Sequence, residues 1–417
     1  MSFRKRNADQ QPKLPQGSRL SAYNGQLLIS TGVPSLDDIL GGGLPVGTVL
    51  LIREDRATTY AQLLLKYFLA QGLASGHHCA LASRDEDANE MLKGLMWLAT
   101  SEAQGDDDDQ HDEAAKSAAR SSTDSDRLKI AWRYSHLKKF ETSVRAAPPP
   151  PRTGTQTSAG DKSNEPRPYC SLFDLTKRVP ESTLEEGNIS ILNPLAGLEY
   201  HENGDDYQAL IDDIRKLIVD NNFSSTKPLP PDTARNVLRI GIHSIASPSW
   251  QYKSSHDMFK FFHALRGLLR FSFGAAVVSI PAYLYDEMPN FVRRVEHMVD
   301  VVIEIESFAG SPIHNDAPYT QNYHGFFRVH KLPVLNSLLP PSTKLSVLSA
   351  GGSNDLAFKL RRKRFAIETF HLPPEGGVSE RRTEPPPSES KKDQGSRVRK
   401  PGMGCGSLPG KKDPLEF

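Results

Sequence analysis

The densest group of side chains that could hold a polyanion is the run Arg361-Arg362-Lys363-Arg364. Phosphate groups suit such a run, because their contacts with Lys and Arg release counterions. If the run lies in a strand, Arg361 and Lys363 face one side and Arg362 and Arg364 the other. A solvated edge strand also suits this pattern, because charge prevents unwanted pairing. We keep both interpretations: contact with RNA phosphates, and protection of a sheet edge.

The hydrophobic pattern changes phase across this basic run. Leu356, Phe358 and Leu360 alternate in one phase, whereas Phe365 and Ile367 continue in the other. A change of phase within an extended segment predicts a bulge or a bend.

A second basic set lies in the extended segment Gly325–Lys331, where Arg328 and Lys331 could enlarge a phosphate-binding face beside His330. The preceding loop Glu306–His324 is rich in aromatic and imidazole rings. These rings could stack on unpaired bases, or equally anchor a neighbouring protein subunit. They belong to Phe308, His314, Tyr319, Tyr323 and His324.

The sequence gives little support for a disulfide framework, a metal site or a catalytic serine. The three cysteines, Cys79, Cys170 and Cys405, have no CxxC spacing, which argues against a disulfide framework or a zinc site and fits a reducing compartment. The histidines, including His77 and His78, lack metal-ligand spacing, so we expect no metal site. No G-x-S-x-G nucleophile pattern occurs.

Composition places the chain among proteins with a folded core and unstructured inserts. Its net charge of +1 means that any RNA-binding surface must be local. The 31 prolines and 30 glycines suggest disordered segments around the core. No apolar run approaches the roughly 20 residues of a membrane helix, and no signal peptide is evident. We expect a cytoplasmic and nuclear protein.

The expected organisation is a single folded domain with inserts and tails. We predict a disordered tail over residues 1–23 and a domain over 24–372. Polar or Pro-rich inserts are predicted at about 101–127 and 146–168, and a disordered tail over 373–417.

Strands and helices alternate along the domain. Continuously apolar strands alternating with amphipathic helices predict an α/β fold with a parallel twisted sheet covered on both faces. Two late segments, Gly325–Lys331 and Leu356–Leu372, have no helix between them and predict antiparallel edge strands. The expected strands are Thr48–Arg53, His77–Ser83, Val237–Ile245, Ala275–Ile280 and Val301–Ile305. The expected helices lie near Tyr60–Phe68, Asp87–Met96, Leu210–Ile218, Met258–Leu269 and Asn290–Val299.

The segment from Ser30 to Leu65 resembles the part of the RecA-like ATPases that leads into their first strand and phosphate-binding loop. Such a P-loop has the form G-x-x-x-x-G-K-[ST]. Aligned on Gly47 and the strand, the motif glycines fall on Glu54 and Thr59. The lysine falls on Tyr60 and the Mg²⁺-binding hydroxyl on Ala61. All four positions are replaced, and Glu54 would repel a polyphosphate.

The metal-binding position of this fold is also replaced. The resemblance implies an Asp at the end of a buried strand, where this sequence has His243. An imidazole is a poor Mg²⁺ ligand. Asp85 and Glu86 follow the second strand, where the water-activating acid of these ATPases lies. Without the other two sites, we interpret them as solvated carboxylates near a helix N-terminus.

Several further strings resemble the Elongator complex protein 4 family, whose members are RecA-like accessory subunits. The strings are GGGLPVGTVLLI (41–52), LLLKYFLAQGL (63–73), KIAWRY (129–134), FDLTK (173–177) and LAFKLRRKRFAIETFHLPPEGG (356–377). The resemblance implies a heterohexameric ring with Elongator subunits five and six, which binds tRNA and docks on the catalytic Elongator subcomplex. It further implies support for wobble-uridine modification of the 5-carboxymethyluridine type, carried out by another subunit.

Two alternatives stay open. An active RecA-like ATPase could hold nucleotide at ring interfaces despite the replaced motif, so ATP is a conceivable cofactor only there. A RecA-like recombination protein would be expected to keep a P-loop, which this sequence lacks. We therefore expect a non-catalytic accessory subunit with no cofactor of its own.

Overall fold

The structure is a computed structural model, and it describes residues 14–99, 167–192, 205–227, 235–254, 256–309, 322–335 and 356–370. The segments 101–127 and 373–417, and all but two residues of 146–168, lie outside this part of the chain. The predicted inserts and the predicted C-terminal tail therefore stay predictions.

Within the described residues, the main sheet has nine strands. In spatial order, β8, β5, β9, β10, β4 and β11 are parallel, and β12, β13 and β14 continue the sheet antiparallel. This large mixed sheet is consistent with a RecA-like fold. The strands are β4 (Val49–Arg53), β5 (His78–Ser83), β8 (Ile189–Leu192), β9 (Leu238–His243), β10 (Gly274–Ile280), β11 (Val301–Ser307), β12 (Gly325–Lys331), β13 (Leu356–Leu360) and β14 (Phe365–Thr369).

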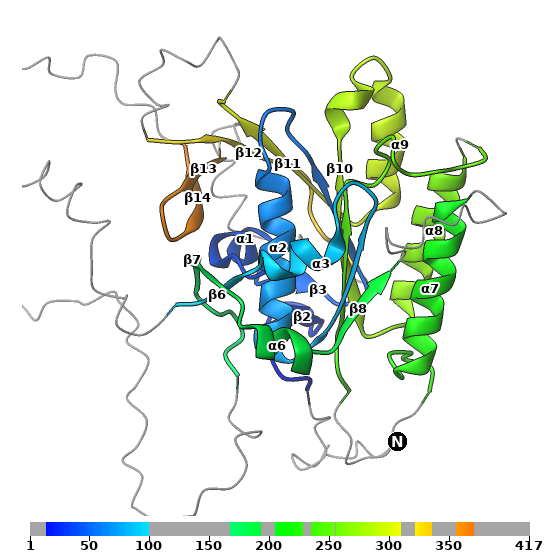
Figure 1. The fold of residues 1–417 in the computed structure, drawn as a ribbon, viewed down its shortest axis with the longest axis horizontal. Helices are drawn as coiled ribbons and strands as arrows, with labels where there is room; N and C mark the ends of the chain where they lie inside the picture. Colours follow the sequence, from blue (N-terminus) through cyan, green and yellow to red (C-terminus); the bar gives the residue numbers. More distant parts are fainter. Residues whose placement is uncertain are drawn as a thin grey trace, which may run out of the picture. The chain divides into compact units, whose positions relative to one another are not determined.

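Helices cover both faces of the sheet, as the continuously apolar strands predict. Figure 1 shows α2 on one side, and α7, α8 and α9 on the other. In β4, Leu50 and Ile52 pack with α2, whereas Val49 and Leu51 pack with α7 and α8. The helices are α1 (Pro34–Ile39), α2 (Tyr60–Ser75), α3 (Ala88–Lys93), α6 (Glu181–Glu186), α7 (Asp206–Asp220), α8 (Asp257–Arg270), the 3₁₀ turn η6 (Ala282–Tyr285) and α9 (Pro289–Met298). None of the described helices is long and apolar enough to cross a membrane.

Two small sheets flank the main one. Their strands are β1 (Ser18–Leu20), β2 (Leu27–Ile29) and β3 (Leu44–Pro45) in the first, and β6 (Met96–Leu98) and β7 (Phe173–Arg178) in the second. Ordered structure therefore begins inside the predicted tail of residues 1–23. The helix predicted as far as Met96 is too long, because α3 ends at Lys93 and Met96 opens β6.

A single buried guanidinium joins β9 to three other elements. Arg239 is fully buried, and its Nη1 donates to the carbonyl oxygens of Ser30 (2.8 Å) and Phe68 (3.1 Å). Its Nε donates to Nδ1 of His77 at 2.9 Å. Burial and the neighbouring Arg239 charge lower the pKa of His77 to about 3. The neutral ring therefore keeps its proton on Nε2, which donates to the carbonyl of Gln16 at 2.6 Å.

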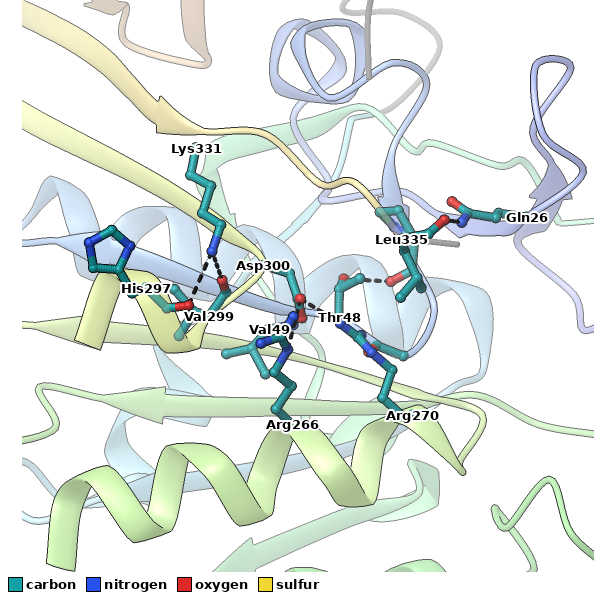
Figure 2. A network of polar contacts seen from close by, with 12 residues as sticks. Gln26, Thr48, Val49, Arg266, Arg270, His297, Val299, Asp300, Lys331 and Leu335 are labelled. Atoms are coloured by element: carbon teal, nitrogen blue, oxygen red, sulfur yellow. Dashed lines mark hydrogen bonds and ion pairs between the residues drawn. The ribbon is translucent and has the colours of Figure 1, made fainter. Parts of the chain in front are cut away.

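A second polar network lies where β4 and β11 begin (Figure 2). Asp300 is 5% exposed, and its carboxylate accepts a hydrogen bond from the Val49 N–H at 3.0 Å. It also pairs with Arg266 at 3.2 Å and with Arg270 on the last turn of α8. Asp300 therefore fixes the start of the central strand against the helix layer.

We predict that Asp300→Asn destabilises the protein strongly. The carboxylate is the buried, charged acceptor of the Val49 N–H, and its two arginine partners are only partly exposed. Loss of a hydrogen bond to a charged group typically costs about 1.5–3 kcal/mol. Asp212→Asn is the matched control, because the Asp212–Arg215 pair is more than half exposed on both sides and such pairs contribute about 0.5 kcal/mol or less. Urea unfolding of the full-length chain measures both values. Equal losses for the two variants would contradict this role of Asp300.

Candidate functional site

The loop between β4 and α2 lies at the carboxyl end of the parallel strands. β4 has β10 on one side and β11 on the other, so the loop emerges from the middle of the sheet. Ligands of open α/β sheets bind at this end of the strands. The loop carries the four replaced P-loop positions, which makes its side chains the first test of a nucleotide site.

Glu54, at the first motif position, is turned into the protein. Its Oε2 accepts a hydrogen bond from the Ser244 hydroxyl at 3.3 Å, and its backbone N–H donates to the carbonyl of Ile280 at 2.9 Å. Burial raises the pKa of Glu54, and the nearby carboxylates of Asp85 and Glu86 add to the effect, against the hydrogen bonds that it accepts. A partly buried carboxyl group thus lies where a P-loop would begin.

The loop satisfies its own donors with a carboxylate. Asp55 accepts hydrogen bonds from the backbone N–H of Ala57 at 3.0 Å and from the hydroxyl of Thr58 at 2.7 Å. In a P-loop such N–H groups bind phosphate oxygens. Thr59 is the N-cap residue of α2, but its side chain makes no capping hydrogen bond.

The last two motif positions are part of the hydrophobic core. Tyr60 meets Phe358 edge to face, with ring centroids 4.9 Å apart, and Ala61 is 3% exposed. Neither can supply the ammonium group or the hydroxyl that a P-loop uses for phosphate and Mg²⁺.

His243 ends β9 as a buried ring. Its Nδ1 lies 3.3 Å from the Ser83 hydroxyl. Burial lowers its pKa, and the carboxylates of Glu86 and Asp85 oppose the shift. Asp85 and Glu86 themselves are exposed; Asp85 accepts from the Ser247 hydroxyl at 2.6 Å.

These contacts do not fit a magnesium–nucleotide complex. Carboxylates occupy the loop after β4, and the aromatic ring of Tyr60 lies at the position that the sequence aligns with a P-loop lysine. The neutral imidazole of His243 ends β9, where the RecA-like resemblance implies an Asp. Within the described residues, no group of three His, Cys, Asp or Glu side chains could hold a metal ion.

The basic run Arg361–Arg364 forms the turn between β13 and β14. The Arg361 N–H donates to the carbonyl of Arg364 at 2.8 Å, which closes a hairpin. Of the predicted bulge or bend, the structure has a bend at residues 362–363, and it reverses the chain between two strands instead of interrupting one extended segment. Strand alternation does not orient these four side chains, and Arg362 and Arg364 are the exposed ones.

The other two predicted basic residues have partners within the protein. Arg328 donates through Nε (2.8 Å) and Nη2 (2.6 Å) to Glu306. The ammonium group of Lys331 donates to the carbonyl oxygens of Glu296, His297 and Val299 at the end of α9. Figure 2 shows the contacts with His297 and Val299. Lys331 thus caps a helix, and its pKa is lowered mainly by burial.

Three of the predicted loop residues are described, and all have contacts within the protein. Phe308 lies edge to face on Phe326, with centroids 4.8 Å apart, and Tyr323 packs against Phe370. His324 accepts through Nδ1 from the Leu360 N–H at 3.2 Å. The last two expected loop residues, His314 and Tyr319, lie outside the described residues.

Known proteins match nearly the whole chain. The PAXNEB protein family matches residues 10–401. Elongator complex protein 4 of Xenopus laevis is 34% identical, over 100% of this chain and 95% of the relative. The chain belongs to the Elongator complex protein 4 family. The Homo sapiens protein of that name is also 34% identical, over 96% of this chain and 88% of its own. The Drosophila melanogaster protein of that name is 29% identical, over 90% of this chain and 93% of its own length.

In this member of the Elongator complex protein 4 family, two features of the site were not predicted from the sequence. Asp55 satisfies the loop donors, and Lys331 serves a helix end rather than an open surface. The D-x-A-T spacing of residues 55–58 is typical of an Asx turn and could have predicted the first. Nothing local in the sequence predicts the second.

We predict that Glu54→Gln stabilises the protein at neutral pH. The folded-state pKa of Glu54 is raised above its ordinary value of 4.5, so the folded state favours the protonated form. Its contribution to stability is complete below pH 4.5 and is lost as pH rises through the folded-state pKa. A neutral amide at this position avoids that loss.

Thermal unfolding of the full-length chain across a pH series measures the effect. The melting temperature of Glu54→Gln should exceed that of the wild type at pH 8, and the difference should shrink as pH falls toward 4.5. Glu186→Gln, at an exposed position on α6, should leave the melting temperature unchanged. A loss of stability at pH 8 for Glu54→Gln would refute the assignment.

Proposed function

We propose that this chain is a non-catalytic subunit of the Elongator complex, acting in tRNA processing. In this proposal it joins Elongator subunits five and six in a heterohexameric RecA-like ring, which binds tRNA and associates with the catalytic subcomplex. The ring supports modification of the wobble uridine to 5-carboxymethyluridine-type products. The chain acts in the cytoplasm and the nucleus, without a membrane partner.

The observation that carries the non-catalytic role is the state of the loop after β4. A carboxylate of the loop already accepts its Ala57 N–H and Thr58 hydroxyl, and Glu54 adds a second carboxyl group behind it. A polyphosphate would have to displace Asp55 and lie against negative charge without a lysine to balance it. We therefore describe the loop as a degenerate P-loop, and we expect no cofactor in this chain.

Two observations favour the β13–β14 turn as the candidate RNA contact. Arg328 and Lys331 have internal partners at hydrogen-bonding distance, so each would have to give up these bonds to bind phosphate. The turn residues protrude from a tight hairpin, where Arg362 and Arg364 are exposed. Phosphate contact by Arg361, Arg362, Lys363 and Arg364 is the form of tRNA binding that we propose.

The alternative is a ring that hydrolyses ATP at subunit interfaces. Nucleotide could then be held mainly by a neighbouring subunit, with this chain contributing from its surface. The two functions differ in whether the loop after β4 takes part in ATP hydrolysis. Mutation of the loop can decide between them.

We predict that the isolated full-length chain does not hydrolyse ATP. Any hydrolysis by a ring reconstituted with subunits five and six should also be unchanged in the variants Asp55→Asn and Tyr60→Phe. The reason is that neither side chain would contact phosphate. Steady-state phosphate release is the measurement, and light scattering confirms that each variant ring assembles. A large loss of turnover in an assembled variant ring would favour the alternative.

We also predict that Arg362→Glu with Arg364→Glu weakens binding of many tRNAs alike, because phosphate contacts carry no base information. Filter binding of the intact ring across a salt series should show a shallower slope, by roughly 0.7–0.9 for each phosphate that the variant no longer binds. The matched control reverses Lys216 and Arg293, two exposed helical cations. If the turn only protects a sheet edge, affinity and slope will match those of the wild type.

A further inference from the structure

The two edge strands of the main sheet, β14 and β8, differ in how the backbone groups that point away from the sheet are hydrogen-bonded. At one edge, hydroxyl groups of neighbouring helices accept the N–H groups of β14 that point away from the sheet. The Phe365 N–H donates to the hydroxyl of Tyr67 at 3.2 Å, and the Ile367 N–H donates to that of Ser35 at 3.1 Å. An edge whose donors are satisfied cannot readily accept another strand.

At the other edge, β8 pairs, among the described strands, with β5 alone. The carbonyl of Asn188 faces β5, since it accepts the Cys79 N–H at 2.8 Å. Backbone groups alternate in direction along a strand, so the N–H and C=O groups of Ile189 and Ile191 point away from β5. They are available for a further ladder.

An apolar groove of about 600 Å³ adjoins this open edge. Its apolar lining consists of Leu92, Val179, Leu184, Ile189 and Ile191. Its rim carries the carboxylates of Glu181 and Glu185, whereas its one lysine, Lys93, is already paired with Glu90 at 3.0 Å. The groove thus combines an apolar floor with a rim that favours a basic ligand.

The groove lies near one end of β6 and β7, because Lys93 lies just before β6 and Val179 just after β7. Residues 100–166 connect the opposite ends of these two strands, after Leu98 and before Phe173. Within that connection, Leu128, Ile130, Trp132 and Tyr134 alternate with smaller or basic residues, a pattern typical of a strand with one apolar face. From residue 127 to residue 139 the sequence has Lys and Arg but no Asp or Glu.

We propose that residues 128–134 bind in this groove as an added strand on the edge of β8. Their apolar phase would cover the groove floor, and their backbone would pair with Ile189 and Ile191. Lys129 and Arg133, in the other phase, would stay in solvent. The tether makes binding intramolecular, and the connection is long enough on each side for this segment to reach the edge.

Photocrosslinking of the full-length chain tests this proposal. A p-benzoylphenylalanine at position 132 should crosslink within its own chain to peptides that contain Val179, Leu184 or Ile189. The same probe at Ser121 should not. Mixing light and isotope-labelled chains separates crosslinks within one chain from crosslinks between copies. Crosslinks between copies, to added subunits five and six, or to other parts of the chain would overturn the proposal.

A matched pair of variants tests the groove itself. Leu184→Glu places a charge on the groove floor and should lower the yield of the crosslink severalfold. Leu172→Glu makes the same change at an exposed leucine and should leave the yield unchanged. An equal yield in both variants would contradict the proposal.

Hydrogen exchange supplies a test that needs no change in the folded core. In wild-type chain the amides of Ile189 and Ile191 should exchange slowly, and Trp132→Asp should accelerate them several-fold while leaving β9 unchanged. Fast exchange at both amides in the wild type would exclude an added strand.

Discussion

Burial of the Arg239 guanidinium constrains the rest of the molecule. A cation with no exposed surface needs acceptors, and here these are two carbonyl oxygens, from Ser30 and Phe68, and the neutral imidazole of His77. Its Nη2 atom has no hydrogen-bond partner among the described residues. Burial lowers its pKa only to about 10, so the group stays charged at neutral pH. These acceptors fix α2, the start of β5 and the end of the N-terminal sheet around β9, because moving any of them away would leave the buried charge with fewer partners.

Helix α2, which contacts Arg239 through the carbonyl of Phe68, begins directly after the loop that follows β4. At its far end, the helix begins with Tyr60 and Ala61 in the hydrophobic core, and the edge-to-face contact with Phe358 joins it to the antiparallel strands. The positions that the sequence aligns with the lysine and the hydroxyl of a P-loop are thus packing positions here.

The strand–helix alternation was predictable from sequence because both faces of each parallel strand are buried, which makes the strands continuously apolar. The end of α3 was not, since Met91, Leu92 and Met96 are all buried although Met96 belongs to a strand. The break at residues 361–364 was predicted as a bulge or a bend, but its hairpin form was not, because a tight hairpin and a bulge give the same change of phase. Arg239 and Lys331 depend on contacts between distant segments, which leave no local pattern.

The internal hydrogen bonds of Asp55 bear on what a phosphate site in this loop would require. A P-loop here would need a lysine in place of Tyr60 and a hydroxyl in place of Ala61, and each change disturbs a packed contact. It would also need the Asp55 carboxylate removed, which leaves the Ala57 N–H and the Thr58 hydroxyl without their acceptor until a phosphate is bound. Each of these three changes therefore removes an internal contact before it adds any affinity, so the loop resists conversion into a phosphate site one residue at a time.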